Sequence, residues 1–180
     1  MTDESPIAEL QFRKTDAQQF EATIAYGDFC HPEKFLLHGD QWRLDAQFLK
    51  WHPWANLLGF DSMYRIERLG GRYLGVQAEN VGPHLSHQLF EESGIDLPAI
   101  LHEYGGRLSL VDTLYGSSVY ELMQEGFLYR VYRTQSGLLV RRSARLDSSR
   151  LGSGLTIEIS KACGKPPGWF DRLQGTLASW

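Results

Sequence analysis

The sequence predicts a mainly β fold: an antiparallel sandwich or a partly open barrel, with helices in the minority. Aromatic residues make up 12% of the 180 residues, and aromatic side chains are enriched in strands. Stretches in which apolar and polar residues alternate recur up to residue 142, with turn residues between them. Short strands at roughly regular spacing are typical of antiparallel sandwiches and barrels.

Composition indicates one globular domain. Apolar residues form 42% of the chain, which is enough for a proper core. We expect a mainly β domain over residues 1–147, in which 1–7 form a loose tail. Residues 148–180 read as a linker followed by a strand and helix extension that packs on the same domain. The net charge of -4 argues against non-specific nucleic-acid binding, which needs a basic surface.

The first strands are predicted from period-two alternation. Leu10 and Phe12 belong to one strand, and the alternating residues 20–26 form the second strand of a hairpin. Residues 35–37 resume a strand. A tight turn at 38–40 then leads into the most aromatic part of the chain, residues 38–73, which holds three of the five tryptophans.

Within that part, one strand and the start of another are readable. Apolar residues at 42, 44, 46 and 48 alternate with polar ones, and Leu49 and Trp51 then take over, a slip that a β-bulge would produce. Pro53 ends the ladder. Residues 55–58 suit a helical turn. The second strand has Tyr64 and Ile66 facing inward and ends at Gly70-Gly71.

The later elements are read from weaker patterns. We expect strands at 74–78 and within 84–90, and a short helix near 96–104 that Asp96 caps and Pro98 begins. A turn at 115–118 precedes a three-stranded meander of residues 119–123, 127–133 and 138–142. The shared face of Trp169, Leu173, Leu177 and Trp180 indicates a C-terminal helix at 169–179, which packs on the domain or anchors to a partner groove.

Metal chemistry has one weak candidate. His38 and Asp40 have the His-x-Asp spacing of two ligands in facial iron sites, and His84, His87 or His102 would have to complete the set. Gly-Asp before a strand is also ordinary turn chemistry. We therefore assign no metal or cofactor, with His38 and Asp40 kept as weak candidates.

Hydrolytic chemistry has no motif. Ser117 or Ser118 would be the nucleophile, with His102 and Asp112 as partners, but no nucleophile-elbow pattern surrounds them. Cys30 and Cys163 form no Cys-x-x-Cys pair, so one disulfide and two free thiols both remain open. A cluster of arginines is either a solvated face with opposite charges nearby or a patch for an anionic ligand: Arg130, Arg133, Arg141, Arg142, Arg145 and Arg150.

Long motifs in the aromatic part resemble a known family. They read GDQWxLDA from Gly39, LKWxPWANLLG from Leu49 and YRxERLxGRY from Tyr64, followed by VDxxYGS from Val111 and SGLL from Ser136. The sequence is similar over about residues 10–142 to short bacterial proteins often labelled "cation/multidrug efflux pump" or "multidrug transporter".

The resemblance implies little chemistry. Relatives commonly carry an N-terminal membrane helix before a soluble domain, and no catalytic residues carry over. This sequence departs from them by lacking a transmembrane-length apolar run, and its part after Asp147 lies outside the similarity. A single domain without spanning segments cannot form a translocation path, so we do not take the label literally. We expect a soluble, cytoplasmic protein whose relatives are membrane-associated.

The predicted function is a non-catalytic module that binds a partner protein or an envelope component through an aromatic surface around Trp51 and Trp54. Trp, Tyr and Arg dominate interface energetics, although the tryptophans also suit a core role. Alternatives are a barrel that binds a lipid or aromatic ligand, and an enzyme of the metal-dependent or hydrolytic kind described above. The candidate binding residues are Trp51, Pro53, Trp54, Arg65, Arg68, Tyr73 and Tyr115.

Overall fold

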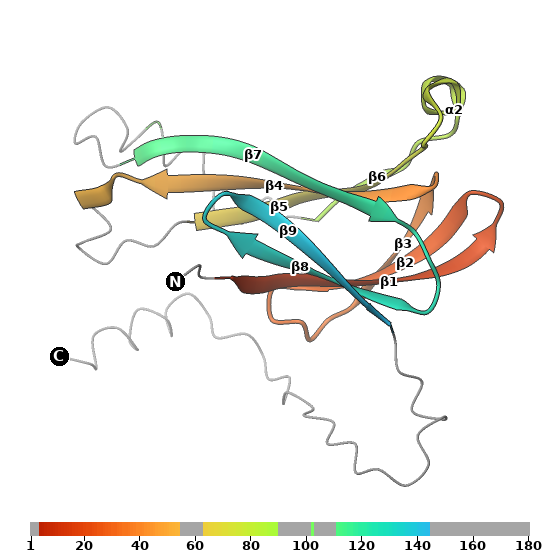
Figure 1. Cartoon of the computed structure of the whole chain (residues 1–180), viewed down its shortest axis with the longest axis horizontal. Helices are drawn as coiled ribbons and strands as arrows, with labels where there is room; N and C mark the ends of the chain where they lie inside the picture. The colour runs from red at the N-terminus through yellow and green to blue at the C-terminus, as the bar shows by residue number, and fades with distance from the viewer. Residues whose placement is uncertain (1–3, 55–62, 90–101, 103–110, 145–180) are drawn as a thin grey trace, which may run out of the picture.

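The structure, a computed structural model, describes residues 4–54, 63–89, 102 and 111–144. These residues form a five-stranded sheet of order β3-β2-β1-β8-β9 and a four-stranded sheet of order β6-β5-β4-β7. All strand pairs are antiparallel. The two sheets face each other (Figure 1). The fold is therefore the predicted antiparallel sandwich, and the sheets do not close into a barrel.

The five-stranded sheet contains the predicted hairpin. Its strands are β1 (Ser5–Asp16), β2 (Gln19–Tyr26), β3 (Glu33–His38), β8 (Phe127–Thr134) and β9 (Gly137–Ala144). In the hairpin Leu10 lies opposite Ile24. The predicted loose tail at 1–7 is wrong for its last residues, because β1 begins at Ser5. Ile7 is buried in the core, which holds this end of the strand in place.

The four-stranded sheet is built on the aromatic part of the sequence. Its strands are β4 (Gln41–Trp51), β5 (Met63–Arg72), β6 (Ser86–Gln88) and β7 (Val111–Leu122). β4 ends before Pro53, and β6 lies within the short strand expected at 84–90. The prediction that Gly70-Gly71 ends β5 is wrong. The ladder continues to Arg72 opposite Gln41, and a side chain at Gly71 would collide with the carbonyl oxygen of His38.

Residues 115–123 and the expected meander need correction. No turn occurs at 115–118, because β7 is continuous and pairs with β4 along its whole length. That ladder overrides the local turn preference of Gly116 and the serines beside it, since strand formation depends strongly on context. The meander is also wrong: β7 belongs to the four-stranded sheet, whereas β8 and β9 pair in the other sheet.

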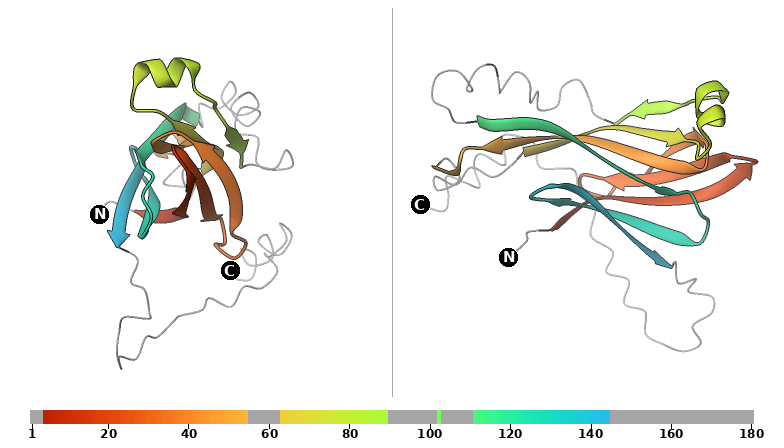
Figure 2. Two further views of the ribbon diagram at one scale, coloured as in Figure 1. Left: turned by 90° about the vertical axis from the view of Figure 1, so that its right-hand side faces the viewer. Right: turned by 45° about the horizontal axis from the view of Figure 1, so that its top comes forward.

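The strand predicted at 74–78 is wrong as well. The structure has helix α2 (Val76–Val81) there, outside the sandwich at one end (Figures 1 and 2). The Glu79 carboxylate accepts a hydrogen bond from the Tyr73 backbone N–H at 2.7 Å, which closes the segment into a turn. Without a neighbouring strand to pair with, this local bond and the helical bonds satisfy the backbone.

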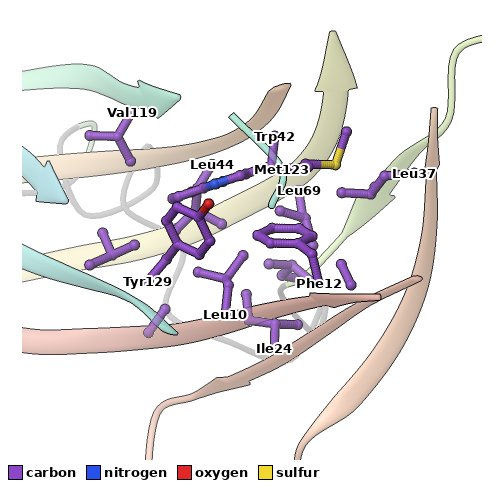
Figure 3. Packing of buried hydrophobic residues seen from close by; sticks show 14 of the residues in the cluster. Leu10, Phe12, Ile24, Leu37, Trp42, Leu44, Leu69, Val119, Met123 and Tyr129 are labelled. Atoms are coloured by element: carbon purple, nitrogen blue, oxygen red, sulfur yellow. The ribbon is translucent and has the colours of Figure 1, made fainter. Parts of the chain in front are cut away.

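A single main core fills the middle of the sandwich. Phe12, Trp42 and Tyr129 are buried between the sheets, where side chains from both sheets point toward one another (Figure 3). The Tyr129 ring meets Phe12 and Trp42 edge-on, with ring centres 5.4 and 5.7 Å apart. Its hydroxyl donates to the Leu122 carbonyl at 2.7 Å. Such edge-to-face pairs add about 0.5–1.5 kcal/mol beyond the area they bury.

Side-chain bonds join the two sheets along both edges. On one side the Leu138 backbone N–H donates to Ser117 Oγ at 3.0 Å. On the other, His87 Nε2 bonds the Leu36 carbonyl at 2.8 Å, and the His87 ring lies 4.7 Å from the Phe35 ring. These bonds satisfy polar groups that would otherwise be left at the sheet edges.

Several predictions fall outside the described residues. They include the helical turn at 55–58, the extension at 148–180 with its helix at 169–179, and the helix near 96–104 apart from His102, whose backbone is helical. Cys30 is disulfide-bonded, while Cys163 lies outside the described part. No helix among the described residues has the length and apolar character needed to cross a membrane.

Candidate functional site

Three aromatic rings line up across β5, β4 and β7 at one end of the sandwich. Phe48 lies opposite Tyr64 on one side and opposite Tyr115 on the other. The Phe48 and Tyr115 rings stack at 5.4 Å with a 15° angle between their planes, and the Phe48 and Tyr64 centres are 6.3 Å apart. This is the end where β4 finishes and β7 begins (Figure 1).

The sequence places these rings on the inner face of their sheet. Trp42, Leu44, Ala46 and Phe48 alternate inward along β4, so cross-strand partners of Phe48 share that face. Lys50 follows two residues later on the same face. From the opposite sheet, Arg133 follows the buried Val131 by two residues. We call Phe48, Lys50, Tyr64, Tyr115 and Arg133 the aromatic end.

Two cations lie over the tyrosine rings of the aromatic end. Lys50 Nζ is 5.1 Å from the centre of the Tyr115 ring, and the Arg133 guanidinium carbon is 5.6 Å from that of Tyr64. Both distances are within the range of cation–π attraction. The aromatic end is thus positively charged and apolar at once.

Two polar groups of the aromatic end have no partner in the described part of the chain. Lys50 makes no ion pair, and the Tyr64 hydroxyl makes no hydrogen bond, within residues 4–54, 63–89, 102 and 111–144. Burial raises the pKa of Tyr64, and the charge of Arg133 opposes this only in part. The Tyr64 hydroxyl therefore keeps its proton at neutral pH and is available as a donor.

Trp51, Pro53 and Trp54 lie at the same end but are not in the ring ladder. Trp51 packs on the outer face against Leu49, together with Met63 and Leu114. The bulge predicted at the slip from Phe48 to Leu49 is wrong, because the pairing with β7 is regular from Phe48 to Lys50 and the irregularity between Lys50 and Trp51 leaves the extra residue, Asp112, in β7. Leu49 packs on the opposite face of the sheet from Phe48. The change of apolar residues from the even to the odd positions of β4 therefore occurs because this end of the strand is apolar on both faces. Pro53 is exposed, and the Trp54 side chain is 39% exposed.

Arg65 and Arg68 lie elsewhere, on the polar outer face of the four-stranded sheet. Arg68 bonds Asp45 Oδ2 through Nε and Nη2 at 3.0 and 2.9 Å, and Ser118 Oγ donates to Asp45 Oδ1 at 2.6 Å. Arg65 bonds Gln47 and Glu67, both at 3.2 Å. The structure therefore does not bring these two predicted binding residues together with the aromatic end.

Tyr73 is a buried scaffold residue near the opposite end of β4. Its hydroxyl donates to the Pro83 carbonyl at 3.0 Å, and its ring meets His84 edge-on at 5.7 Å. These contacts brace the segment that carries α2. Of the seven predicted binding residues, only Trp51, Pro53, Trp54 and Tyr115 share one end of the molecule.

The His38–Asp40 turn is a structural corner. Asp40 accepts bonds from Gln18 Nε2 at 2.9 Å and from the Leu74 N–H at 3.0 Å, one on each carboxylate oxygen. Its backbone bonds Arg72 and Met123. Gly39 has φ of +122°, and a Cβ there would collide with the Arg72 carbonyl. The His-x-Asp spacing of His38 and Asp40 is therefore explained by the turn that packs against Arg72 of β5, and not by metal binding.

The other histidines do not gather at Asp40. His84 Nε2 bonds the Glu79 carbonyl at 2.6 Å, and His87 Nε2 bonds Leu36. A carbonyl can only accept, so these nitrogens carry protons and are not free to bind a metal. Within the part of the chain that the structure describes, no three His, Cys, Asp or Glu side chains form a metal-binding group.

The serines also have structural partners. Ser117 Oγ accepts from Leu138, and Ser118 Oγ donates to Asp45. Asp112 lies five positions before Ser117 in the same strand, which places the two about 17 Å apart along it. Asp112 therefore cannot complete a triad with Ser117.

Most of the described arginines in the predicted cluster are neutralised. Arg130 pairs with Glu9 at 2.6 Å and Arg141 with Glu4 at 2.7 Å. Arg142 lies 3.9 Å from the Glu121 carboxylate and donates to the Gln124 amide oxygen at 2.9 Å. This supports a solvated face with opposite charges for these three residues. Arg133 continues the inner face of its strand, and its guanidinium lies over the Tyr64 ring. Arg145 and Arg150 lie outside the described residues.

Sequence reasoning treated the members of the aromatic end separately. Alternation places Phe48 and Tyr64 on the apolar faces of two strands, Arg133 falls in a cluster of arginines, and Lys50 carries no predicted role. Their convergence depends on the register of β5 and β7 against β4. Comparison of the chain with models of protein families, with curated proteins and with solved structures gave no match.

Proposed function

We propose that the protein is a non-catalytic binding module whose ligand contacts the aromatic end. The observation that carries this is the ladder of Phe48, Tyr64 and Tyr115 on the inner face, accompanied by a lysine and a tyrosine hydroxyl without partners among the described residues. Binding sites typically combine apolar walls with a few polar groups that fix orientation. Asp40, Ser117 and Ser118 instead make bonds that hold the fold together.

A small apolar or aromatic ligand fits this arrangement best. The middle of the sandwich is filled by Phe12, Trp42 and Tyr129, so a ligand would sit between the ends of the sheets rather than deep inside. Tyr64 and Tyr115 are half-buried and retain surface for contact. This places the proposed site at the mouth of the sandwich, unlike the barrel interior expected from the sequence.

A partner protein or envelope component is the second candidate. Trp54 is well exposed, and it lies close in sequence to Trp51 and the outer apolar cluster around Leu49. Exposed tryptophans are common anchors of protein interfaces. We also propose that the chain belongs to the bacterial family labelled as efflux proteins. A partner associated with the membrane would be compatible with that family.

The compartment is also a proposal. The sequence favours the cytoplasm, whereas the disulfide bond at Cys30 is typical of an oxidising compartment. The cytoplasm and an oxidising compartment can be distinguished by alkylating thiols in freshly lysed cells. The mass of the protein is then measured with and without prior reduction. An unmodified mass that gains alkyl groups only after reduction supports the oxidising compartment, and immediate alkylation at Cys30 supports the cytoplasm.

The ligand proposal is tested with N-phenyl-1-naphthylamine, an uncharged aromatic probe that fluoresces in apolar sites. We expect saturable binding to the full chain and a loss of about tenfold in affinity in Tyr115→Ala, because one aromatic wall is removed. Tyr120→Ala is the matched control, since Tyr120 is exposed on the outer face of the same strand. Equal loss in both variants, or in neither, contradicts the proposal.

The partner candidate is tested by placing a photo-crosslinking residue at position 54 in cells of the native host. A discrete crosslinked protein that disappears when the residue is moved to Tyr120 supports an interface at Trp54. Absence of any crosslink at position 54, with the full-length protein present, counts against it.

A further inference from the structure

The charge of the aromatic end contrasts with the rest of the protein. The chain carries a net charge of -4, and elsewhere in the described part arginines lie against carboxylates: Arg68 with Asp45, and Arg130 with Glu9. At the aromatic end Lys50 Nζ lies over the Tyr115 ring. No ion pair in the described residues brings a carboxylate to Lys50.

Lys50 occupies a position that an apolar residue would otherwise fill. It continues the inward series that ends at the buried Phe48, and its side chain is half-buried. A lysine can lay its methylene stem along apolar surface while its ammonium stays in contact with water, where an anion can reach it. The Tyr115 ring supplies about 0.5–2 kcal/mol of cation–π attraction but no acceptor for the three N–H groups.

The Tyr64 hydroxyl provides a second donor at the same end. A tyrosine hydroxyl is protonated at neutral pH, and that of Tyr64 has no acceptor among the described residues. An ammonium and a phenol hydroxyl next to aromatic rings are complementary to an anion attached to an apolar body. Hydrogen bonds to ionised groups are about twice as strong as those between neutral groups.

We propose that the aromatic end binds an amphipathic anion, whose carboxylate or phosphate group is held by Lys50 and the Tyr64 hydroxyl while its apolar body lies against the Tyr115 ring. This inference rests on the proposed ligand-binding function and specifies its ligand class. Arg133 adds positive charge from the other sheet. The anion takes the place of the carboxylate partner that Lys50 lacks in the described part of the chain.

The test compares two probes that differ by a single charge. 8-Anilinonaphthalene-1-sulfonate has the same aromatic body as N-phenyl-1-naphthylamine plus a sulfonate. With the full-length protein we expect the anionic probe to bind about tenfold more tightly than the neutral one, since one charge-assisted contact is worth about that factor. Added salt should reduce this preference but leave the neutral probe unaffected.

Variants then assign the preference to Lys50. In Lys50→Met the affinity for the neutral probe should persist and the preference for the anion should fall below about threefold, whereas Lys50→Arg should retain it. Tyr64→Phe should lower only the affinity for the anion, by about threefold. The matched control is Lys34→Met, since Lys34 lies on the five-stranded sheet and pairs with Glu21 at 3.3 Å.

The outcomes separate this inference from the proposed function. Equal binding of the two probes to the natural protein overturns the anion site but leaves the ligand site, provided that Tyr115→Ala weakens both. The anion site is also overturned if a folded Lys50→Met variant still binds the anionic probe more tightly than the neutral one. Probe binding that is insensitive to Tyr115→Ala overturns the proposed function and the anion site together. Displacement of the anionic probe by decanoate or by decyl phosphate then identifies which head group is preferred.

Discussion

The two halves of β4 use the same residue types for different purposes. In the first half, Trp42 is fully buried between Phe12 and Tyr129, and Asp40 bonds Gln18, Arg72, Leu74 and Met123. In the second half, Phe48 stacks on Tyr115, but Lys50 beside them has no ionic partner among the described residues. Aromatic density alone does not separate a core from a binding site. Exposure does: Trp42 is closed off between the sheets, where even its indole Nε1 has no hydrogen-bond partner among the described residues, whereas Lys50, Tyr64 and Tyr115 are half-buried.

The largest effect is expected from Trp42→Ala. The side chain is 0% exposed, and its removal leaves a cavity between two sheets that cannot collapse easily. We expect a loss of about 3–5 kcal/mol in the free energy of unfolding, measured by urea denaturation. Trp54→Ala is the comparison, and we expect it to change stability by less than about 1 kcal/mol. Similar losses for both variants would remove the distinction between the two halves.

A smaller loss is expected from Asp40→Ala. The substitution removes the acceptor of the Leu74 N–H and the Gln18 amide, and because water can reach both donors the loss should be about 1 kcal/mol. The difference in the free energy of unfolding between Asp40→Ala and the natural protein should be the same with and without an excess of a metal chelator. A chelator that destabilises only the natural protein would restore the metal interpretation of His38 and Asp40.

Tyr129→Phe should cost about 1 kcal/mol at neutral pH, because the bond to the Leu122 carbonyl is lost. Burial raises the pKa of Tyr129, as it does for Tyr64 and Tyr73. Above pH about 10 the unfolded chain releases these protons while the folded chain keeps them, so stability falls as pH rises. The variant should show a shallower fall between pH 9 and 11. An identical fall would mean that Tyr129 does not contribute.

The smallest effect on stability is expected from Lys50→Met. No ion pair of the described residues is broken, and a partly buried charge is removed, so the free energy of unfolding should change by less than about 0.5 kcal/mol. Heat denaturation of the ligand-free protein measures this. Together with the change in probe binding, it would show that Lys50 serves recognition. A loss above about 2 kcal/mol would show that it serves the fold.

The structure confirmed most strands that had clear period-two alternation. The hairpin around Leu10 and Ile24, the strand from Trp42 and the strand through Tyr64 are present as predicted. Errors occurred where a distant partner decided the conformation. Gly116, Ser117 and Ser118 resemble a turn locally but lie in mid-strand, because β4 offers them a complete ladder. Residues 76–78 resemble a strand, but no strand pairs with them.

The candidate site was predictable only in part. Trp51, Trp54 and Tyr115 were selected because aromatic residues favour interfaces, and they do lie at one end. Arg65, Arg68 and Tyr73 were selected on the same motifs, but the structure commits them to an outer-face ion-pair network and to bracing α2. Arg133 is named in the arginine cluster but Lys50 is not among the predicted binding residues, because the two are 83 positions apart in sequence and come from opposite sheets.

The sequence by itself determined the fold class and the face on which most strand residues lie, since alternation of side chains is a property of one strand. Strand order, register and the meeting of β4, β5, β7 and β8 at the aromatic end were decided by tertiary structure. Pairing joins residues that are far apart in the chain, and no local pattern records the partner. Which side chains lie beside Lys50 is likewise decided by strand pairing, and the proposed function depends on those neighbours.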